Sequence, residues 1–184
     1  MSQTPRIPPV SDEEMSAAQR ELLGPFLQSG RVDNVFRTLA QHPDLMKRWL
    51  PFARHILSKS TLSPREREIL ILRSGYLCRA EYEWAQHVRL GKRVGLSDAD
   101  IGRIMAGQGL SPPEDLLLRA ADELHKNARI TEATWNGVAE HYSREQLIDI
   151  IFTVGQYTMV SMMLNSLGVQ VDDYLKGGYP PLPG

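Results

Sequence analysis

Residues 62–95 read LSPREREILILRSGYLCRAEYEWAQHVRLGKRVG, and this stretch decides the fold class. The Ser-Pro-Arg-Glu at residues 63–66 combines a helix-capping serine, a proline suited to the first helical position and a capping-box glutamate. The apolar spacing that follows predicts one helix over residues 64–77 and a second over residues 80–94. Gly95 should end the second helix, because glycine readily takes the left-handed conformation of a helix C-terminus.

The rest of the chain carries the same helical signals. Apolar residues recur at three- and four-residue spacing, and no stretch alternates apolar and polar residues as a half-buried strand would. The chain is therefore predicted to be all-α. The other helices are expected at residues 11–24, 34–41, 98–106, 114–127, 132–142 and 144–167, with one more that starts at Pro43.

Prolines and glycines shape both ends of the chain. Ser11 starts a capping box for the first helix, which should end near residues 24–25, a Gly-Pro pair. Pro51 lies inside the following long helix, where it removes one backbone hydrogen bond, so a kink or a break is expected over residues 50–52. The tail KGGYPPLPG at residues 176–184 should be extended and flexible unless it docks on a neighbour.

The composition predicts a single cytoplasmic domain over residues 1–184. A hydrophobic content of 42% suffices for one core, and 21 basic against 22 acidic residues give no excess charge to gather nucleic acid or an anionic membrane. The first ten residues lack the apolar core of a secretory signal, and we expect no run to span a bilayer. Cys78 is the one cysteine, so no intramolecular disulfide can form.

The helix expected at residues 144–167 is the most apolar, with apolar side chains on nearly every face. We interpret it as a central core helix or as one buried in a subunit interface, and we expect a homo-oligomer. Ser63 precedes Gly75 by the same twelve residues by which Ser143 precedes Gly155, an interval that suggests a duplicated helical hairpin. Glycines inside helices also suggest close approach of a neighbouring helix.

The helix over residues 80–94 carries the residues best placed for chemistry. His87 lies at the edge of its apolar stripe, which predicts partial burial, and Glu83 precedes it by four residues, within contact reach. A buried imidazole beside a carboxylate can be tuned for acid or base work near neutral pH. In an antiparallel hairpin Glu68 of the preceding helix can face His87, whereas Glu66 is occupied by its capping role.

Structural roles are the alternatives for these residues. A histidine on a helix edge is more often a satisfied structural residue than a catalyst, and a Glu–His pair four residues apart contributes only about a few tenths of a kcal/mol. Trp84 and Tyr82 are typical packing residues as well as candidates for stacking on a ligand. Cys78 is interpreted as an inert buried thiol unless a positive group such as Arg79 or His87 activates it.

The other histidines show no pattern typical of a metal site. No metal-ligand spacing, glycine-rich phosphate loop or serine-elbow motif occurs in the sequence. We therefore expect no metal and no cofactor. The histidines in question are His42, His55, His125 and His141.

Several segments resemble the carboxymuconolactone decarboxylase-like family, which includes the AhpD-like proteins. The resemblance is best over residues 40–107 and implies an AhpD-like helical bundle. The segments that carry it are LSPREREILILR at 62–73, EYEWAQH at 81–87, Gly-Leu-Ser at 95–97 with Ile101 and Ile104 after it, and the lead-in HPDL at 42–45 and WLP at 49–51.

The AhpD-like branch of the family implies a Cys-x-x-Cys pair, a histidine four residues later and a proton-relaying glutamate one helix earlier. Aligned on His87, the two cysteines fall at Ala80 and Glu83, and the relay glutamate falls at Glu68. Both thiols are absent, so peroxide reduction through a disulfide loses its redox centre. Cys78 has no partner thiol to resolve an oxidised sulfur.

The decarboxylase branch also lacks the cysteine pair and is similar to this chain in keeping a carboxylate and a histidine at Glu83 and His87. It implies cofactor-free acid–base chemistry, in which loss of carbon dioxide leaves a carbanion or enolate that must be held and protonated. His87 would donate the proton, Glu83 would orient or recharge it, and Glu68 would shuttle protons. Arg73 is a candidate clamp for the substrate carboxylate or else neutralises a glutamate in the core, and Trp84 is a candidate substrate contact.

The leading hypothesis is a lyase-like acid–base enzyme that acts on a small organic acid or lactone. Peroxidase, or peroxiredoxin, activity through Cys78 is the alternative within catalysis. A non-catalytic helical oligomer is the alternative outside it, and there replacement of His87 would alter stability but no turnover.

Overall fold

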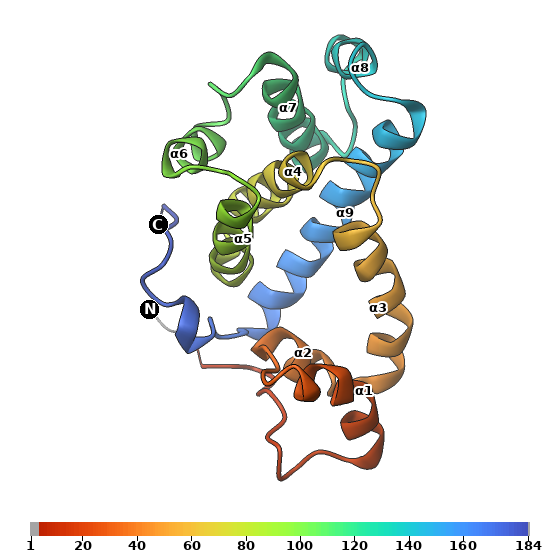
Figure 1. Ribbon diagram of the computed structural model, residues 1–184, viewed down its shortest axis with the longest axis vertical. Coiled ribbons are helices and arrows are strands. Elements are labelled where there is room, and N and C mark those ends of the chain that lie inside the picture. The colour runs from red at the N-terminus through yellow and green to blue at the C-terminus, as the bar shows by residue number, and fades with distance from the viewer. Residues whose placement is uncertain (1–3, 184) are drawn as a thin grey trace.

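The computed structural model describes residues 4–183, and over these residues the chain is all-helical, without a strand (Figure 1). The predicted all-α class is confirmed, and the helix with its cap at Ser97 and the long apolar helix lie at their predicted bounds. The elements are α1 (Ala17–Gln28), α2 (Asn34–Leu39), α3 (Pro43–Ser58), α4 (Pro64–Leu77), α5 (Glu81–Arg93), α6 (Asp98–Ala106), α7 (Pro112–Asn127), α8 (Glu132–Ala139), α9 (Arg144–Leu167) and the short 3-10 helix η1 (Asp173–Leu175).

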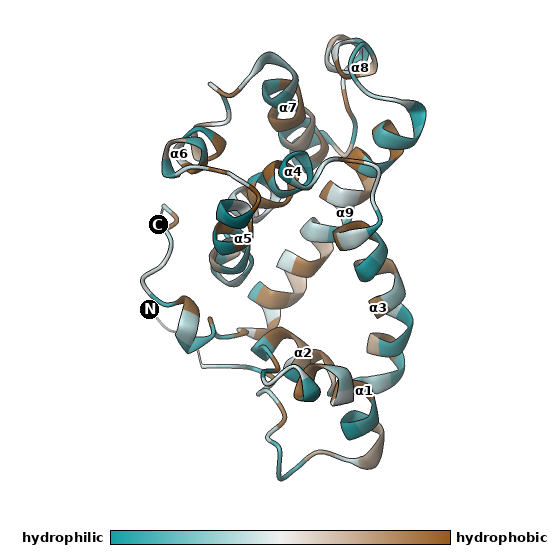
Figure 2. Ribbon diagram, in the orientation of Figure 1, coloured by the Kyte–Doolittle hydropathy of each residue, from teal (hydrophilic) through white to brown (hydrophobic). Residues whose placement is uncertain are grey.

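Helix α4 forms the centre of the larger part of the bundle and packs against α5, α7 and α9. Every residue from 68 to 75 is buried, and the apolar run 69–72 is 0% exposed. Four consecutive residues point to all sides of a helix, so this run can be buried only if other helices cover every face. In Figure 2 the hydrophobic colour gathers where α4, α7 and α9 meet.

A smaller apolar cluster joins α1, α2 and α3 at one end of the molecule, around Leu23 and Met46. The predicted start of the first helix is wrong. Ser11 does exchange hydrogen bonds with Glu14, but this is a separate turn, and α1 begins at Ala17 behind a second capping box. Two capping signals follow each other closely here, and the second one leads directly into the segment that buries Leu23.

Neither proline in this region ends a helix. α1 continues through Pro25 to Gln28, and α3 runs from Pro43 to Ser58 with Pro51 inside it. The predicted end at residues 24–25 is therefore wrong, and of the kink or break expected over residues 50–52 the break does not occur. Both prolines are exposed, as are the residues four positions earlier whose carbonyls lose a partner, so water can satisfy those carbonyls.

Helix α9 crosses the molecule against α3, α4, α5, α7 and α8. It continues without interruption through Gly155. The interval from Ser143 to Gly155 therefore belongs to one long helix and does not form a second hairpin. An added Cβ would lie 3.6 Å from the Glu83 side chain at Gly75 but would meet nothing within 4 Å at Gly155. Of these two glycines, only Gly75 has a neighbouring helix packed closely against it, as was expected for both.

Two faces of α9 differ in chemistry. One face buries polar side chains, including Asp149, Thr153, Tyr157 and Ser161, each four residues after the last. The opposite face exposes apolar side chains at alternating four- and three-residue steps, interrupted by the exposed Gly155. This second set, which we call the α9 stripe, consists of Ile148, Phe152, Met159 and Met162, each 49–63% exposed.

By length and composition alone, α9 could cross a membrane, which corrects the expectation that no run reaches that length. More than half of the apolar stretch of α9 is buried inside the fold. A buried core helix of a protein without a membrane span can have the same length and hydropathy. The buried polar face that includes Asp149 and Thr153 would be costly in lipid. These features favour the predicted role as a core helix.

The tail docks on α5 and is not free. The Trp84 indole N–H donates to the Pro180 carbonyl at 2.8 Å, and the Tyr179 hydroxyl donates to Glu81 at 2.9 Å. The tail was expected to be flexible unless it docked on a neighbour, and it docks on α5. The last residue, Gly184, lies outside the described residues.

Candidate functional site

Glu68 of α4 meets Glu83 and His87 of α5 inside the bundle. His87 Nδ1 lies 2.7 Å from Glu68 Oε2, and His87 Nε2 lies 3.0 Å from Glu83 Oε1. The three side chains are 3–7% exposed. Ionised carboxylates only accept hydrogen bonds, so an imidazole ring between two of them donates from both nitrogens and is an imidazolium. The structure brings together the three residues selected from the sequence, and their catalytic role remains a prediction.

The turn between α4 and α5 sets this geometry. Arg79 takes a left-handed conformation with φ of 51°, and the Ala80 N–H donates back to the Gly75 carbonyl at 2.9 Å. This tight reversal places Gly75 against the first turn of α5, where Glu83 lies. His87 then follows one helical turn after Glu83 and faces the same neighbour, α4.

The two carboxylates decide the charge of His87. Burial by itself lowers the pKa of this imidazole, but the charges and hydrogen bonds of Glu68 and Glu83 outweigh it and raise the pKa from 6.5 to about 10. His87 is therefore a cation at neutral pH and can serve as a proton donor.

Tyr157 of α9 adds a side chain that the sequence analysis did not select. Its ring meets the His87 ring edge-on, with centroids 5.0 Å apart and planes at 81°. Burial and then the charges of Glu83 and Glu68 raise the pKa of the Tyr157 hydroxyl well above 10, while Arg67 opposes this shift. The hydroxyl is therefore protonated at neutral pH. The four-residue recurrence of polar residues along α9 was a sequence signal that could have identified Tyr157.

The charge of His87 predicts a pH dependence of stability. Since the folded pKa of about 10 exceeds the unfolded value of 6.5, the folded state binds this proton more tightly. The stabilisation should be complete below pH 6.5 and should be lost as the pH rises toward 10. NMR should show the His87 ring protons at imidazolium shifts still at about pH 8.5, and urea unfolding should show a falling free energy of unfolding over the same window. A titration midpoint near 6.5 would contradict this assignment.

Arg73 makes four hydrogen bonds, none of them to the cluster. It donates to both oxygens of Asp122 at 2.5 and 2.9 Å, and to the carbonyls of Ile104 and Met105 at 2.9 and 2.8 Å. A substrate carboxylate would have to displace these bonds, so the clamp assignment is not supported. The stated alternative was neutralisation of a glutamate in the core, and the partner is instead Asp122 of α7.

Trp84 and Cys78 also have structural surroundings. Trp84 is 0% exposed, packs with Tyr76 and holds the tail through its indole N–H. Cys78 is half-buried, and its Sγ lies 3.8 Å from His125 Nδ1. Burial raises the pKa of the Cys78 thiol, contacts with hydroxyls of α9 lower it less, and the nearby Glu83 raises it further. The thiol therefore stays protonated near neutral pH.

Metal-ligand geometry does not occur in the part of the chain that the structure describes: no three histidine, cysteine, aspartate or glutamate side chains are grouped to hold an ion. His42 instead caps α3, accepting from the Leu45 N–H, and His55 lies 4.0 Å from Asp149. A reaction without metal or cofactor remains a prediction.

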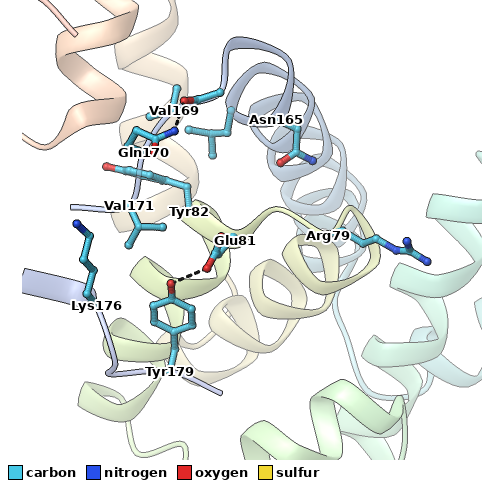
Figure 3. Close-up of a pocket in the computed structure, with 11 residues that line it drawn as sticks. Arg79, Glu81, Tyr82, Asn165, Val169, Gln170, Val171, Lys176 and Tyr179 are labelled. Carbon is cyan, nitrogen blue, oxygen red and sulfur yellow. Dashed lines mark hydrogen bonds between the residues drawn. The ribbon is translucent and has the colours of Figure 1, made fainter. Parts of the chain in front are cut away.

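A surface cavity of about 570 Å³ is lined by residues of α5, α9 and the C-terminal segment (Figure 3). Helix α5 contributes Glu81 and Tyr82, the end of α9 contributes Asn165, and the C-terminal segment contributes Lys176 and Tyr179. Figure 3 shows the Glu81–Tyr179 hydrogen bond and the Arg79 side chain, which also lines the cavity. None of the three cluster residues lines this cavity.

Comparison with known proteins gives one family match. Residues 43–123 match the model of the carboxymuconolactone decarboxylase family. No curated protein matches the chain.

Solved structures share the fold over nearly the whole chain. An AhpD-core, uncharacterized peroxidase-related protein from Ralstonia eutropha JMP134 is 19% identical, with a TM-score of 0.81 and 95% and 96% of the two chains covered. A peroxidase-related protein from Silicibacter sp. TM1040 is 16% identical, with a TM-score of 0.79 and coverages of 96% and 98%. A variant of the debrominase Bmp8, in complex with 2,3,4-tribromopyrrole, is 14% identical, with a TM-score of 0.78 and 96% of both chains covered. At these identities the likeness establishes the fold.

Proposed function

We propose that this chain is a cofactor-free acid–base enzyme for a small organic acid or lactone, because residues 43–123 match the carboxymuconolactone decarboxylase family model and the chain has an AhpD-like fold. The observation that carries the proposal is the buried imidazolium of His87 between Glu68 and Glu83. Perturbed ionisable groups held in a dry site are typical of general acids and bases. Neither aligned cysteine position of the AhpD-like branch carries a thiol, which favours proton transfer over redox chemistry.

Each member of the cluster has a role in this proposal. When the bond to the departing carboxylate breaks, its electron pair passes into the conjugated carbonyl system of the substrate as an enolate. Carbon dioxide leaves, the enolate carbon takes the place of the Glu83 carboxylate at His87 Nε2, and it accepts the proton from that nitrogen. Glu68, the closer partner of His87, returns a proton to the imidazole from solvent, and Glu83 holds the ring in place. The protonated Tyr157 hydroxyl is a further hydrogen-bond donor beside the ring.

The test is carbon dioxide release from a panel of carboxylated lactones and unsaturated acids. With Glu68→Gln we expect a loss of turnover of about 10²-fold or more, because glutamine keeps the side-chain shape but cannot relay a proton. With Cys78→Ser we expect turnover close to wild type. Absence of carbon dioxide release from every substrate, with wild-type protein that is folded, would reject the proposal.

The second candidate function is a one-cysteine peroxidase, suggested by the peroxidase-related proteins of the same fold and by Cys78 near the cluster. The raised pKa of the thiol counts against it, since the thiolate is the reactive form. In the same experiment, peroxide consumption that is lost in Cys78→Ser would favour this candidate over the decarboxylase.

Part of the proposal is a homo-oligomer that covers the α9 stripe, in a protein that we place in the cytoplasm. The stripe has the alternating four- and three-residue spacing by which two helices pack side by side. Met159→Lys should therefore lower the molecular mass in solution, measured by light scattering, whereas Trp135→Lys on the exposed face of α8 should leave it unchanged. A wild-type mass equal to the 20.8 kDa of one chain would contradict the oligomer.

A further inference from the structure

Arg67 stands next to Glu68 on α4 but faces a different side of the helix. It lies one turn before Ile71, which packs with Ile56 of α3 and Tyr157 of α9. Its charge acts on the Tyr157 hydroxyl, where it opposes the larger effects of burial and of the two glutamates. Arg67 is therefore a cation at the border of the cluster, on the side that α3 and α9 close.

The Arg67 guanidinium is not saturated by the protein. Its Nε is buried, yet no group in residues 4–183 accepts a hydrogen bond from it, and no described carboxylate forms an ion pair with the side chain. The contrast with Arg73 is direct, since Arg73 uses four bonds to Asp122 and two carbonyls. A buried donor without a partner is uncommon in native proteins and calls for a ligand or water.

Two side chains of α9 share this property. Thr153 is 0% exposed and Gln156 is 4% exposed, and among the described residues neither Thr153 Oγ1 nor Gln156 Oε1 has a hydrogen-bond partner. Thr153 lies one turn before Tyr157, and Gln156 directly precedes it. Unsatisfied polar groups thus concentrate on the elements that meet at Tyr157, the residue in contact with His87.

We propose that Arg67 binds the carboxylate of the substrate, the role that the sequence analysis gave to Arg73. This inference rests on the proposed function. The cluster holds two acidic side chains, so an incoming carboxylate requires a cation beside it. Arg67 is only partly exposed, with its Nε buried. Its planar fork can hold a carboxylate through two parallel hydrogen bonds.

A purely structural role for Arg67 would be to offset the charge of the two glutamates. That role makes no distinction between an acid and its ester, whereas a carboxylate-binding role does. The two can therefore be separated by paired ligands of nearly the same shape. Muconate and dimethyl muconate form such a pair.

The first measurement uses the wild-type protein and does not depend on turnover. Muconate should shift the Arg67 Nε–H resonance in a ¹⁵N NMR titration, assigned through the backbone, and dimethyl muconate should not. Equal shifts with both ligands, or no shift with either, would overturn the assignment. Because no variant is needed, the test stands even where Arg67→Gln does not fold.

The second measurement is kinetic and uses a substrate from the panel that turns over. Arg67→Gln should raise KM by about 10- to 100-fold, as expected for a lost charged hydrogen bond, and Arg67→Lys should recover part of this. Arg93→Gln removes the same charge from an exposed position of α5 and should leave KM unchanged. Turnover with an unaltered KM in Arg67→Gln would reject the role of Arg67 and keep the proposed function. Muconate binding at Arg67 without turnover of any substrate would support the role of Arg67 and reject the proposed function.

Discussion

Replacing His87 with alanine is expected to lower kcat by about 10²- to 10⁴-fold, the contribution typical of a positioned general acid. The imidazolium is the proton donor that faces both glutamates, and no other described cation lies between them. The KM of a carboxylated substrate should change little, since Arg67 is retained. The measurement is steady-state carbon dioxide release by wild type and variant.

The control for this change is His141→Ala, which removes an exposed histidine. It should leave kcat and stability unchanged. A folded His87→Ala protein with wild-type turnover would remove His87 from the reaction and leave the non-catalytic oligomer as the better interpretation. The variant should also be destabilised by about 3–5 kcal/mol, because breaking a buried ion pair leaves buried charge without a partner.

Replacing Arg73 with glutamine is expected to lower the free energy of unfolding by about 3 kcal/mol, the lower end of the range for a broken buried ion pair. The lower end applies because the Asp122 side chain is 38% exposed and can be solvated once its partner is gone. The carbonyls of Ile104 and Met105 would also lose their donor. Urea unfolding measures this loss.

The kinetic result separates the two roles considered for Arg73. If Arg73 only connects α4 to α6 and α7, turnover per folded molecule should be unchanged at a temperature where the variant is folded. Arg103→Gln, which removes an exposed pair with Asp100, should cost only about 0–1 kcal/mol. A selective rise in KM for Arg73→Gln, without loss of stability, would restore Arg73 as the carboxylate clamp.

The helices were readable from the sequence wherever a cap and an apolar run coincided. The segment behind Ser63 and the helices behind Ser97 and Ser143 begin where they were predicted to begin. Prediction failed at Ser11, where a second capping signal follows within the same few residues. The helix also does not break at Pro51, because the cost of a proline depends on whether water can reach the freed carbonyl, and a sequence does not give exposure.

The candidate site was predictable in part for a similar reason. Glu83 and His87 share one helix, so their spacing alone places them together, and a hairpin suffices to add Glu68. The contribution of α9 could not be placed in this way, because Tyr157 reaches His87 only through packing of helices about seventy residues apart in sequence. The choice between Arg67 and Arg73 depended on hydrogen-bond partners, which no local pattern reports.

The burial of residues 68–75 of α4 joins the chemistry of this protein to its core. Glu68 begins the segment of α4 whose every residue is covered by neighbouring helices, so its carboxylate is held as firmly as the packing around it. Such rigidity favours preorganisation of a proton donor. It also means that changes to the apolar interior will shift the carboxylate relative to the imidazole. Variants selected for altered reactivity can therefore arise at positions that never touch a substrate.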